Sequence, residues 1–344
     1  MATLKDIANM TGVSTATISR ILNDNDQHSF SKETIEQVKE VARSLNYVPS
    51  RKKKIKKQVD TINTLSLRIA VVFWFQESLE HGYEYYHGIR MGLEKRFIER
   101  NIQFKRYYTV NQLVQSEKRE LDGIIATGKF SSFEIKQLES LSCPIIFVDT
   151  SPNPLKYGSV VVDFFKAVHD IIDYLVNNGH KSIGYIGMKE YTVSTKEPIP
   201  DVRKDSFEMI TKYKDIFNKS HVYIIDESTP SAGYNIIKDR VIHQEIPDAF
   251  IVFSDTIAMG VLRGLLEEGI SVPNDLSIIS FDDLPIAEYT FPPLSTVRIQ
   301  TEMMGSFAFD LMVDQILNKE KLPKKIVIPH ELIIRESSRR LSNR

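Results

Sequence analysis

The chain has 344 residues, 42% of them hydrophobic, and a formal net charge of −1 at pH 7. This length allows two or three domains with well-filled cores. A single cysteine, Cys143, excludes an internal disulfide, and no apolar run approaches the ~20 residues that a membrane span requires. No signal peptide precedes Leu4, so we expect a cytoplasmic protein without a membrane partner.

The near-zero net charge conceals an uneven distribution along the chain. Residues 1–58 carry 11 Lys and Arg against 6 Asp and Glu, whereas the remainder carries 33 against 39. A basic N-terminal segment and an acidic remainder predict that nucleic acid binds to the N-terminal part and not to the rest of the protein.

Residues 4–22 predict a helix-turn-helix, with Gly12 in the turn. Thr3 and Asp6 have the spacing of a capping box, and Ser14 can cap the second helix. The apolar residues at helical spacings around the turn are Ile7, Ala8, Val13, Ile18, Ile21 and Leu22. Two short helices can therefore pack around one small core.

The second of these helices has an outward edge suited to reading DNA. Arg20 can donate two hydrogen bonds to a guanine, Ala16 can touch a thymine methyl group, and Thr15 can do either. The short polar residues suited to phosphate contacts are Ser14, Thr17, Ser19 and Asn23. The alternative is a small helical hairpin with a solvated arginine. Gly12 and the hydroxyls at both caps favour the DNA-binding interpretation.

A third helix follows, from the cap at Ser31 through Tyr47, and Pro49 closes it. The next residues, 50–58, read SRKKKIKKQ. A lysine run is commonly a solvated linker, but its position beside a DNA-reading head makes Lys53 and Lys54 candidates for phosphate contacts.

Beyond residue 67, short β-rich runs alternate with helical stretches. The expected strands are 67–74, 122–127, 144–149, 158–163, 182–187, 221–226, 249–255, 276–283 and 325–335, and the expected helices are 86–100, 133–141, 164–178, 202–217, 232–243, 256–268 and 301–317. This alternation predicts an α/β fold of two doubly wound lobes with parallel sheets covered on both faces. Ligands of such proteins bind at the carboxyl ends of strands, in the cleft.

Motifs over nearly the whole chain resemble those of the LacI/GalR family of sugar-responsive repressors. The head contains VSTATISRILN and SLNYVP, and the body contains NNGHKSIGYIG, PDVRKDSF, SDTIAMGVLRGLLEEGISVPNDLSIISFDD and FPPLSTVR. The ending FPPLSTVRIQTEMMGS and the segment VFWFQESLEHGYEYYHGI are most similar to the galactose-operon and evolved-β-galactosidase repressor subgroup. The resemblance implies a DNA-binding head, a hinge and a core of two lobes like a periplasmic sugar-binding protein.

The resemblance also implies a sugar site in the cleft. It places Arg203, Ser254 and Asp282 at ligand positions, with serine at 254 where the family usually has asparagine. A guanidinium and a carboxylate suit adjacent sugar hydroxyls. The alternatives are a surface ion pair for Arg203 and a strand-end or helix-cap acid for Asp282 and Asp283.

Aromatic side chains are expected to cover the apolar face of the sugar ring. The candidates are Trp74, Phe75, Tyr85, Tyr86, Phe164 and Phe281. The family often has an aromatic residue where this chain has Ser228, so the wall of the site must come from elsewhere. Each candidate is alternatively a core residue.

The hinge departs from the family pattern, in which small residues and a leucine follow the proline. Ile55 is the one apolar candidate to wedge between base pairs, and repulsion between lysines four residues apart should keep the segment disordered without DNA. We expect a DNA-binding domain at 1–48, a hinge at 49–66 and a core at 67–340. Its lobes would be 67–163 with 284–300, and 164–283 with 301–340.

No pattern predicts a catalytic site, a cofactor or a metal site. The sequence contains no phosphate-binding glycine loop and no HExxH, and Cys143 has no second cysteine as a metal partner. The expected function is a homodimeric repressor that binds double-stranded operator DNA and is released by a small sugar, galactose or a galactoside being favoured. The alternatives are a sugar-binding module without DNA function, a co-repressor-dependent regulator and a sugar-modifying enzyme fused to a DNA-binding head.

Overall fold

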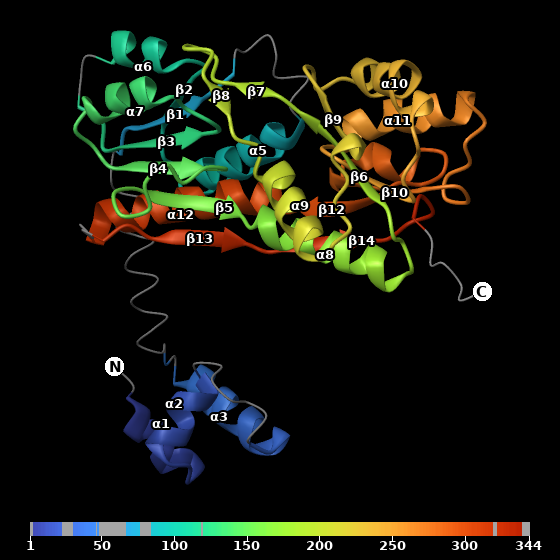
Figure 1. The fold of residues 1–344 in the computed structure, drawn as a ribbon. Helices are drawn as coiled ribbons and strands as arrows, with labels where there is room; N and C mark the ends of the chain where they lie inside the picture. The colour runs from blue at the N-terminus through green and yellow to red at the C-terminus, as the bar shows by residue number, and fades with distance from the viewer. Residues whose placement is uncertain are drawn as a thin grey trace. The chain divides into compact units, whose positions relative to one another are not determined.

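The structure is a computed structural model that describes residues 3–22, 30–45, 47, 67–75, 84–117, 120–318 and 322–338. The chain divides into a small helical unit that ends before Leu67 and a larger α/β unit that begins there. We call the helical unit the head and the larger unit the core unit (Figure 1).

The head consists of α1 (Leu4–Thr11), α2 (Thr15–Leu22) and α3 (Lys32–Ser44). The Thr3 hydroxyl accepts from the Asp6 amide at 3.4 Å, and the Asp6 carboxylate accepts from the Thr3 amide at 2.7 Å. This reciprocal capping box satisfies two donors at the start of α1. Gly12 ends the helix with φ of 70°, a conformation that glycine adopts without steric cost.

The three helices enclose one apolar cluster. Its fully or nearly fully buried members are Ile7, Ile18, Ile21, Val38 and Ala42. Each helix contributes at least one of them, so the predicted pairing of α1 with α2 depends on α3 as well.

The core unit contains two six-stranded sheets among the described residues. The first has the order β13-β5-β4-β3-β1-β2, with β1 Ile69–Phe73, β2 Phe104–Tyr107, β3 Gly123–Thr127, β4 Ile145–Val148, β5 Gly158–Val162 and β13 Lys325–Ile328. The second has the order β14-β12-β11-β10-β6-β9, with β6 Ile183–Met188, β9 Val222–Ile225, β10 Ala249–Val252, β11 Ser277–Asp282, β12 Ser295–Ile299 and β14 His330–Ile333. We call the part built on the first sheet lobe 1 and the part built on the second sheet lobe 2.

Helices cover both sheets, as the predicted α/β class requires, and this prediction is confirmed. Lobe 1 carries α5 Glu84–Glu99, α6 Val110–Ser116, α7 Ser132–Glu139 and α12 Thr301–Asn318. Lobe 2 carries α8 Phe164–Asn177, α9 Val202–Tyr213, α10 Pro230–Asp239, α11 Asp255–Glu267 and the short 3-10 turns η3 Lys219–His221, η4 Val241–His243 and η5 Pro285–Glu288. The small hairpin of β7 Glu190–Tyr191 and β8 Pro198–Ile199 follows β6.

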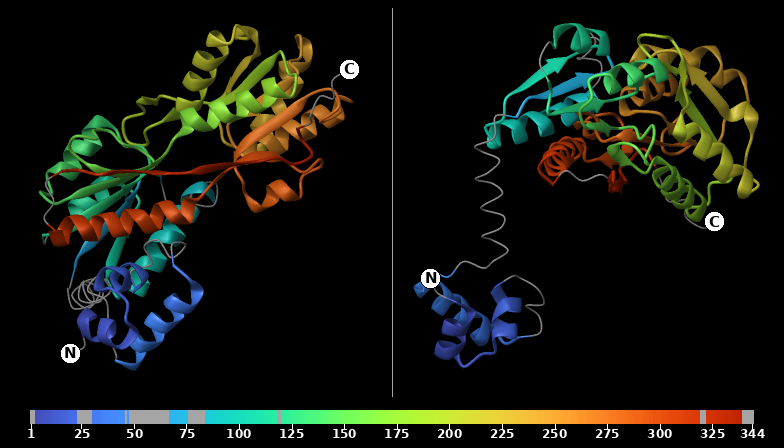
Figure 2. Two further views of the ribbon diagram at one scale, coloured as in Figure 1. Left: turned by 90° about the horizontal axis from the view of Figure 1, so that it is seen from below. Right: turned by 90° about the vertical axis from the view of Figure 1, so that its left-hand side faces the viewer.

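The expected division of residues 284–340 between the lobes is wrong for β12, α12 and β13, whereas β14 lies in lobe 2 as expected. The expectation places residues 284–300 in lobe 1, but β12 pairs with β11 in lobe 2. It places residues 301–340 in lobe 2, but α12 packs on α5, β3, β4 and β5, and β13 pairs with β5, all in lobe 1. The chain therefore passes between the lobes after β5, after β12 and between β13 and β14 in the described part, and Figure 2 (left) shows the last of these passages.

Other differences have local causes. The expected strand 325–335 is divided at Pro329, which cannot donate a ladder hydrogen bond, so β13 and β14 join different sheets. The strand β2 is absent from the expected strands because it lies at the edge of its sheet, where Lys105 and Arg106 are exposed and the apolar run is lost.

Candidate functional site

The outward edge of α2 is formed as the sequence predicts. Thr15, Ala16 and Arg20 are exposed, whereas Ile18 and Ile21 of the same helix are fully buried. The helix is held from behind by its apolar face, so the exposed edge is available to a DNA groove.

Some of the polar residues that are expected to contact phosphates form hydrogen bonds within the head. The Ser14 hydroxyl accepts from the Thr17 amide at 3.2 Å and lies 2.9 Å from the Thr17 hydroxyl. Ser14 is thus the N-cap of α2, and Ser19 is half-buried. Asn23, Lys53, Lys54 and Ile55, which are also expected to contact DNA, lie outside the described residues.

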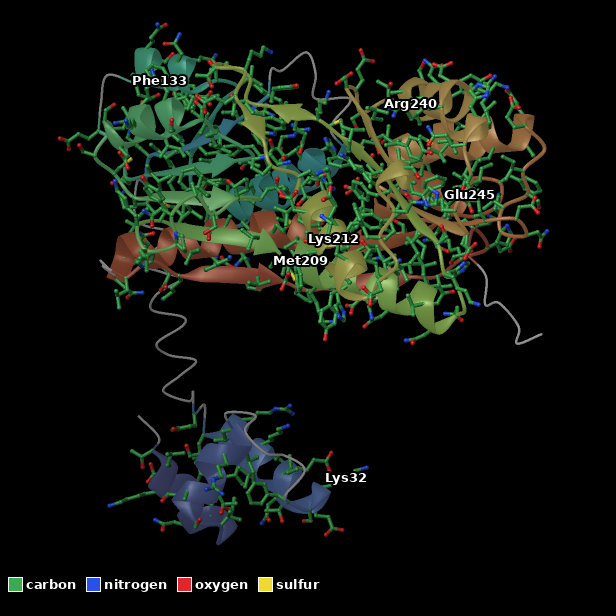
Figure 3. The ribbon with its side chains drawn as sticks, in the orientation of Figure 1. Lys32, Phe133, Met209, Lys212, Arg240 and Glu245 are labelled. Carbon is green, nitrogen blue, oxygen red and sulfur yellow. The ribbon has the colours of Figure 1, made fainter. Side chains whose placement is uncertain are left out.

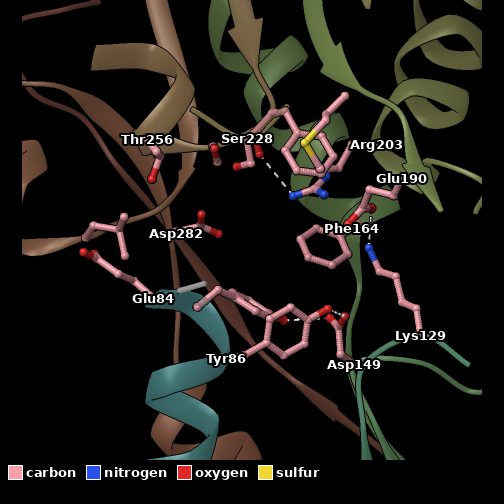
Figure 4. A pocket seen from close by; sticks show the side chains of 15 residues that line it. Glu84, Tyr86, Lys129, Asp149, Phe164, Glu190, Arg203, Ser228, Thr256 and Asp282 are labelled. Atoms are coloured by element: carbon pink, nitrogen blue, oxygen red, sulfur yellow. Dashed lines mark hydrogen bonds and ion pairs between the residues drawn. The ribbon is translucent and has the colours of Figure 1, made fainter. Parts of the chain in front are cut away.

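A cavity lies between the two lobes of the core unit, at the carboxyl ends of the strands (Figure 4), and its space of about 620 Å³ includes solvent at the open side. We call it the first cavity. Its described lining residues from lobe 1 are Glu84, Tyr85, Tyr86, Lys129 and Asp149; those from lobe 2 are Phe164, Met188, Glu190, Arg203, Ser228, Phe253, Ser254, Thr256, Asp282 and Leu284.

Arg203 is fixed in the wall that lobe 2 contributes. It is 9% exposed, its NH1 group donates to the Phe253 carbonyl at 3.1 Å, and its Nε lies 3.6 Å from Asp201 Oδ1. The guanidinium also lies over the rings of Phe253 and Phe164, at 3.4 and 4.9 Å from their centres. Burial alone would lower the pKa of Arg203, but nearby acids, Asp201 first, raise it above its ordinary value. The group is therefore a permanent, oriented cation facing the cavity (Figure 4).

Asp282, at the end of β11, faces the same cavity. Burial and the neighbouring Asp255 carboxylate raise the pKa of Asp282 to about 7. Its φ of 109° is in the left-handed region, which is unusual for a residue other than glycine and is typical of functional sites. The adjacent Asp283 has a different role, because it pairs with Arg298 and Arg335 at 2.6 and 2.8 Å.

Lobe 1 contributes a matching acid that is absent from the sequence-based candidates. Asp149 follows β4, has φ of 76°, and accepts hydrogen bonds from the hydroxyls of Tyr85 and Tyr86 at 2.8 and 2.7 Å. Burial, and then the Asp149 charge, raise the pKa of both tyrosines well above 10, so both stay protonated donors. The sequence does carry a signal, since an acid directly after the strand IIFV stands at the edge of the sheet where ligands bind.

An ion pair joins the two lobes across the cavity. Lys129 of lobe 1 contacts Glu190 of lobe 2, and the two side chains are 17% and 7% exposed. Both residues line the cavity (Figure 4), and neither is among the sequence-based candidates. Because they are distant in the sequence and belong to different lobes, no local pattern indicates their contact.

The expected aromatic wall requires a correction. Tyr85, Tyr86 and Phe164 line the cavity, whereas Trp74, Phe75 and Phe281 are buried and are not among its described lining residues. Trp74 packs against Gly128, where a side chain would lie within 1.8 Å of the indole ring. The Phe281 ring lies 5.6 Å from the Arg203 guanidinium and supports it from behind.

Two serines complete the lobe 2 side. Ser254 lines the cavity and also caps α11, accepting from the Ile257 amide at 3.4 Å. Ser228 lines the cavity as well, so a small hydroxyl group stands where the family often has an aromatic side chain. The next residue after Ser254, Asp255, is fully buried and accepts from Thr296 and from the Leu284 amide, both at 2.7 Å.

Metal sites and membrane-spanning helices were also searched for in the described part of the chain. Within the described ranges, no group of three or more His, Cys, Asp or Glu side chains is arranged to hold a metal ion. Among the same residues, no helix has the length and apolar character to cross a membrane.

The fold and the two sites define a class: a helix-turn-helix DNA-binding unit joined to a two-lobed α/β unit with a ligand cavity between its lobes. Comparisons with known proteins agree. Residues 3–50 match the description "Bacterial regulatory proteins, lacI family", and residues 172–338 match a periplasmic binding protein-like domain. The chain is 32% identical to the HTH-type transcriptional regulator GalR of Streptococcus thermophilus over 340 residues, which are 98% of this chain and all of the relative.

Two further matches extend over almost the same length. The HTH-type transcriptional repressor MelR of Bacillus subtilis (strain 168) is 33% identical over 98% of this chain and 97% of its own. The solved complex of the transcriptional regulator CelR with cellobiose has a TM-score of 0.69 at 24% identity, covering 98% of this chain and all of that one. The chain belongs to the lacI family of bacterial regulatory proteins, and the family predicted from its motifs is confirmed. It is a DNA-binding transcriptional regulator.

Proposed function

We propose that the protein is a homodimeric repressor, acting in the cytoplasm, that leaves its operator when an uncharged sugar binds in the first cavity. The observation that carries this proposal is the pairing, in one chain, of an exposed α2 reading edge with a cavity where Arg203 and Asp282 face Tyr86 and Asp149. Resemblance to the galactose-operon subgroup favours galactose or a galactoside as the effector.

The chemistry of the cavity suits a polyhydroxylated ligand. Arg203 supplies fixed donors, and Asp282 supplies acceptors for two neighbouring hydroxyl groups. Phe164 offers an aromatic surface to the C–H face of a sugar ring, and Ser254 adds a hydroxyl group. Such convergent polar groups on an apolar wall are typical of sites that orient a small ligand.

The charges of the cavity favour an uncharged ligand. Among its described lining residues, four acids stand against two cations, Lys129 and Arg203. The four acids are Glu84, Asp149, Glu190 and Asp282. A phosphate group would be repelled by this excess, so we expect sugar phosphates to bind much more weakly than the parent sugars.

The dimer is proposed to form through lobe 1, which has an exposed apolar surface. Met91 and Ile98 of α5 are 44% and 76% exposed, and Met303 and Phe307 of α12 are 42% and 40% exposed. The helices α5 and α12 pack against each other. Met91 and Ile98 are seven residues apart, and Met303 and Phe307 are four apart, so the two exposed residues of each helix share one face of it. An Ile98→Glu variant should sediment as a monomer at concentrations where the wild type is dimeric.

In the dimer, two heads would read the two halves of a pseudopalindromic operator. Thr15, Ala16 and Arg20 are the proposed base-reading residues, and Ser14, Thr17 and Ser19 with Asn23, Lys53 and Lys54 the proposed phosphate contacts. Ile55 is the proposed minor-groove wedge. The two-fold arrangement raises the effective concentration of the second head once the first is bound.

A thermal-shift screen of the purified protein tests the effector class. Galactose, galactosides, glucosides and their phosphates would be compared, and we expect uncharged galactosides to raise the melting temperature. Deleting residues 1–58 should abolish operator binding and leave the sugar shift intact. A sugar that binds and strengthens operator binding would instead define a co-repressor, and a full chain that binds sugar but no DNA would define a sugar-binding module.

A further inference from the structure

The chain leaves β11 through two consecutive residues in the left-handed region. Asp282 has φ of 109° and Asp283 has φ of 56°, although neither is glycine. Residues with a side chain rarely adopt this conformation, and it persists only where the surrounding structure holds it. We call residues 282–284 the turn after β11. Because Asp282 faces the first cavity (Figure 4), the groups that hold this turn also determine where the Asp282 carboxylate lies.

The Asp282 carboxylate is not fixed by contacts of its own. In the part of the chain that the structure describes, no hydrogen bond or ion pair joins it to another residue. Its direction therefore depends on the backbone of the turn. The functional groups of a binding site have to be held within about 0.5 Å of their productive geometry, so this backbone has to be fixed by its neighbours.

Two backbone amides of the turn are held by buried side chains. The Asp283 amide donates to the Thr296 hydroxyl at 3.3 Å. The Leu284 amide donates to the Asp255 carboxylate at 2.7 Å, and the Ser280 hydroxyl donates to the same carboxylate. The Thr296 hydroxyl also donates to Asp255, at 2.7 Å. One hydroxyl group of β12 thus accepts from the turn and donates to the acid that holds the next residue of the turn.

The side chain of Asp283 is anchored as well. Its Oδ2 atom lies 2.6 Å from Arg298 Nε, and its Oδ1 atom lies 2.8 Å from Arg335 Nη1. Arg298 lies on β12, opposite Asp282 in the register of the two strands, and Arg335 also donates to the Leu294 carbonyl at 2.9 Å. The Asp283 side chain is 7% exposed, so these charge-assisted hydrogen bonds are shielded from water and hold the turn firmly.

The groups that hold the turn do not touch a ligand in the first cavity. Thr296 and Asp255 are fully buried, and Thr296, Asp255, Asp283 and Arg335 are not among the described residues that line this cavity. Their effect on a bound sugar has to pass through the turn. Asp255 also acts through its charge, which raises the pKa of Asp282, whereas Thr296 is uncharged. Removal of the Thr296 hydroxyl is therefore the more direct test of geometry.

We infer that Thr296 is a positioning residue of the effector site: its hydroxyl group holds the turn after β11 in the conformation that presents the Asp282 carboxylate to the ligand. The Asp255 carboxylate and the ion pairs of Asp283 act with it. This inference rests on the proposed function, because it assumes that Asp282 binds a sugar hydroxyl group. It adds residues that touch no ligand to those that determine effector affinity.

Calorimetric titration of the full chain with galactose, methyl β-galactoside and lactose tests this inference, and the sugar that the wild type binds most tightly is the probe. Thr296→Val removes the hydroxyl group from a side chain of similar shape and should weaken binding by about tenfold, whereas Thr296→Ser keeps the hydroxyl and should lose no more than about twofold. The matched control is Thr211→Val. Thr211 is also fully buried in lobe 2, but its hydroxyl donates to the Phe207 carbonyl of its own helix at 2.6 Å, so affinity should be unchanged.

A double-mutant cycle separates positioning from a general loss of structure. If Thr296 acts through Asp282, its effect disappears once the carboxylate is gone. The double variant Asp282→Asn with Thr296→Val should then bind the probe within about twofold of Asp282→Asn alone, whereas independent contributions would give a further loss of about tenfold. Arg335→Gln, which removes one ion pair of the turn, provides a second cycle in case Thr296→Val does not fold. A wild-type stoichiometry in the titration shows that a variant is folded.

Three results would overturn the positioning role and leave the proposed function intact. They are wild-type affinity in both Thr296→Val and Arg335→Gln, an equal loss in Thr296→Ser or Thr211→Val, and a loss that multiplies with that of Asp282→Asn. Absence of binding by the wild type to all three sugars would overturn the proposed function and this inference together.

Discussion

The head and the cleft achieve specificity in opposite ways. The head is built from contacts between residues close in the sequence, and its candidate reading residues, Thr15, Ala16 and Arg20, are exposed and lie within six positions of one helix. The cleft brings together residues from Glu84 to Leu284, and its chief polar groups are buried or half-buried.

This difference determines how each site responds to change. An exposed side chain on a well-packed helix can be removed without disturbing its neighbours, so its contribution to binding is nearly independent. In the cleft, the charged groups are electrostatically coupled, since Asp255, Arg203 and Asp149 all shift the pKa of Asp282. Removal of one group therefore changes the protonation of the others.

The largest expected effect is therefore in the cleft. Asp282→Asn should weaken sugar binding by about a hundredfold, about 2.7 kcal/mol, because the amide replaces an acceptor oxygen by a donor next to Arg203. Operator binding without sugar should be unchanged. Calorimetry and operator titration would measure both, with Asp226→Asn, an acid whose side chain is 77% exposed on lobe 2, as the matched control. Wild-type sugar affinity in Asp282→Asn would remove Asp282 from the site.

The next effect is in the head. Arg20→Ala should cost about 1–3 kcal/mol on the cognate operator and relax the base preference at one position of each half-site, because a bidentate contact with guanine is lost. Lys32→Ala, which removes another exposed cation of the head (Figure 3), should leave the base preference unchanged. Equal losses on operator and random DNA for Arg20→Ala would contradict base reading by Arg20.

A smaller effect is a pH dependence confined to the cleft. Because burial raises the pKa of Asp282 to about 7, its carboxylate is largely protonated at pH 6 and largely ionised at pH 8. Sugar hydroxyls donate to the ionised form, so sugar affinity should rise by about tenfold from pH 6 to pH 8. Asp255, whose pKa burial raises to about 6, titrates in the same range, and Arg203, Asp149 and Glu84 face Asp282.

Calorimetry at several pH values measures this dependence. The Asp282→Asn variant should show a flatter profile, and operator binding without sugar provides an internal reference for titrations elsewhere in the chain. An increase in sugar affinity toward lower pH would contradict the proposed role of the carboxylate as acceptor.

The smallest effect concerns the scaffold of the head. Thr3→Ala removes one side of the capping box of α1 and should lower the stability of the head by about 1 kcal/mol. Amide hydrogen exchange of α1 in the full chain would detect this loss as reduced protection. Met10→Ala, at a 59% exposed position of the same helix, should change protection less, and equal changes would show that the cap contributes nothing specific.

The same contrast explains which parts of the molecule are predictable from the sequence. The head follows from capping residues and apolar spacing within a few positions, and the helices and inner strands of the core follow from apolar runs. The lobe to which residues 284–340 belong does not follow, because strand order is decided by contacts between distant segments, as for β12 beside β11. In the cleft, Arg203 and Asp282 stand in recognisable motifs, whereas the Lys129–Glu190 pair depends on two lobes meeting and has no signature in either segment.

The central claim is that sugar occupancy of the cleft lowers the affinity of the head for DNA. The most direct measurement is fluorescence anisotropy of an operator selected from random duplexes by the full chain, titrated with protein in the absence and presence of a saturating sugar. We predict about a hundredfold weaker operator binding with sugar, equivalent to about 2.7 kcal/mol of coupling, and no change for Asp282→Asn. Unchanged operator affinity in the wild type, at a sugar concentration that calorimetry shows to be saturating, would contradict this claim.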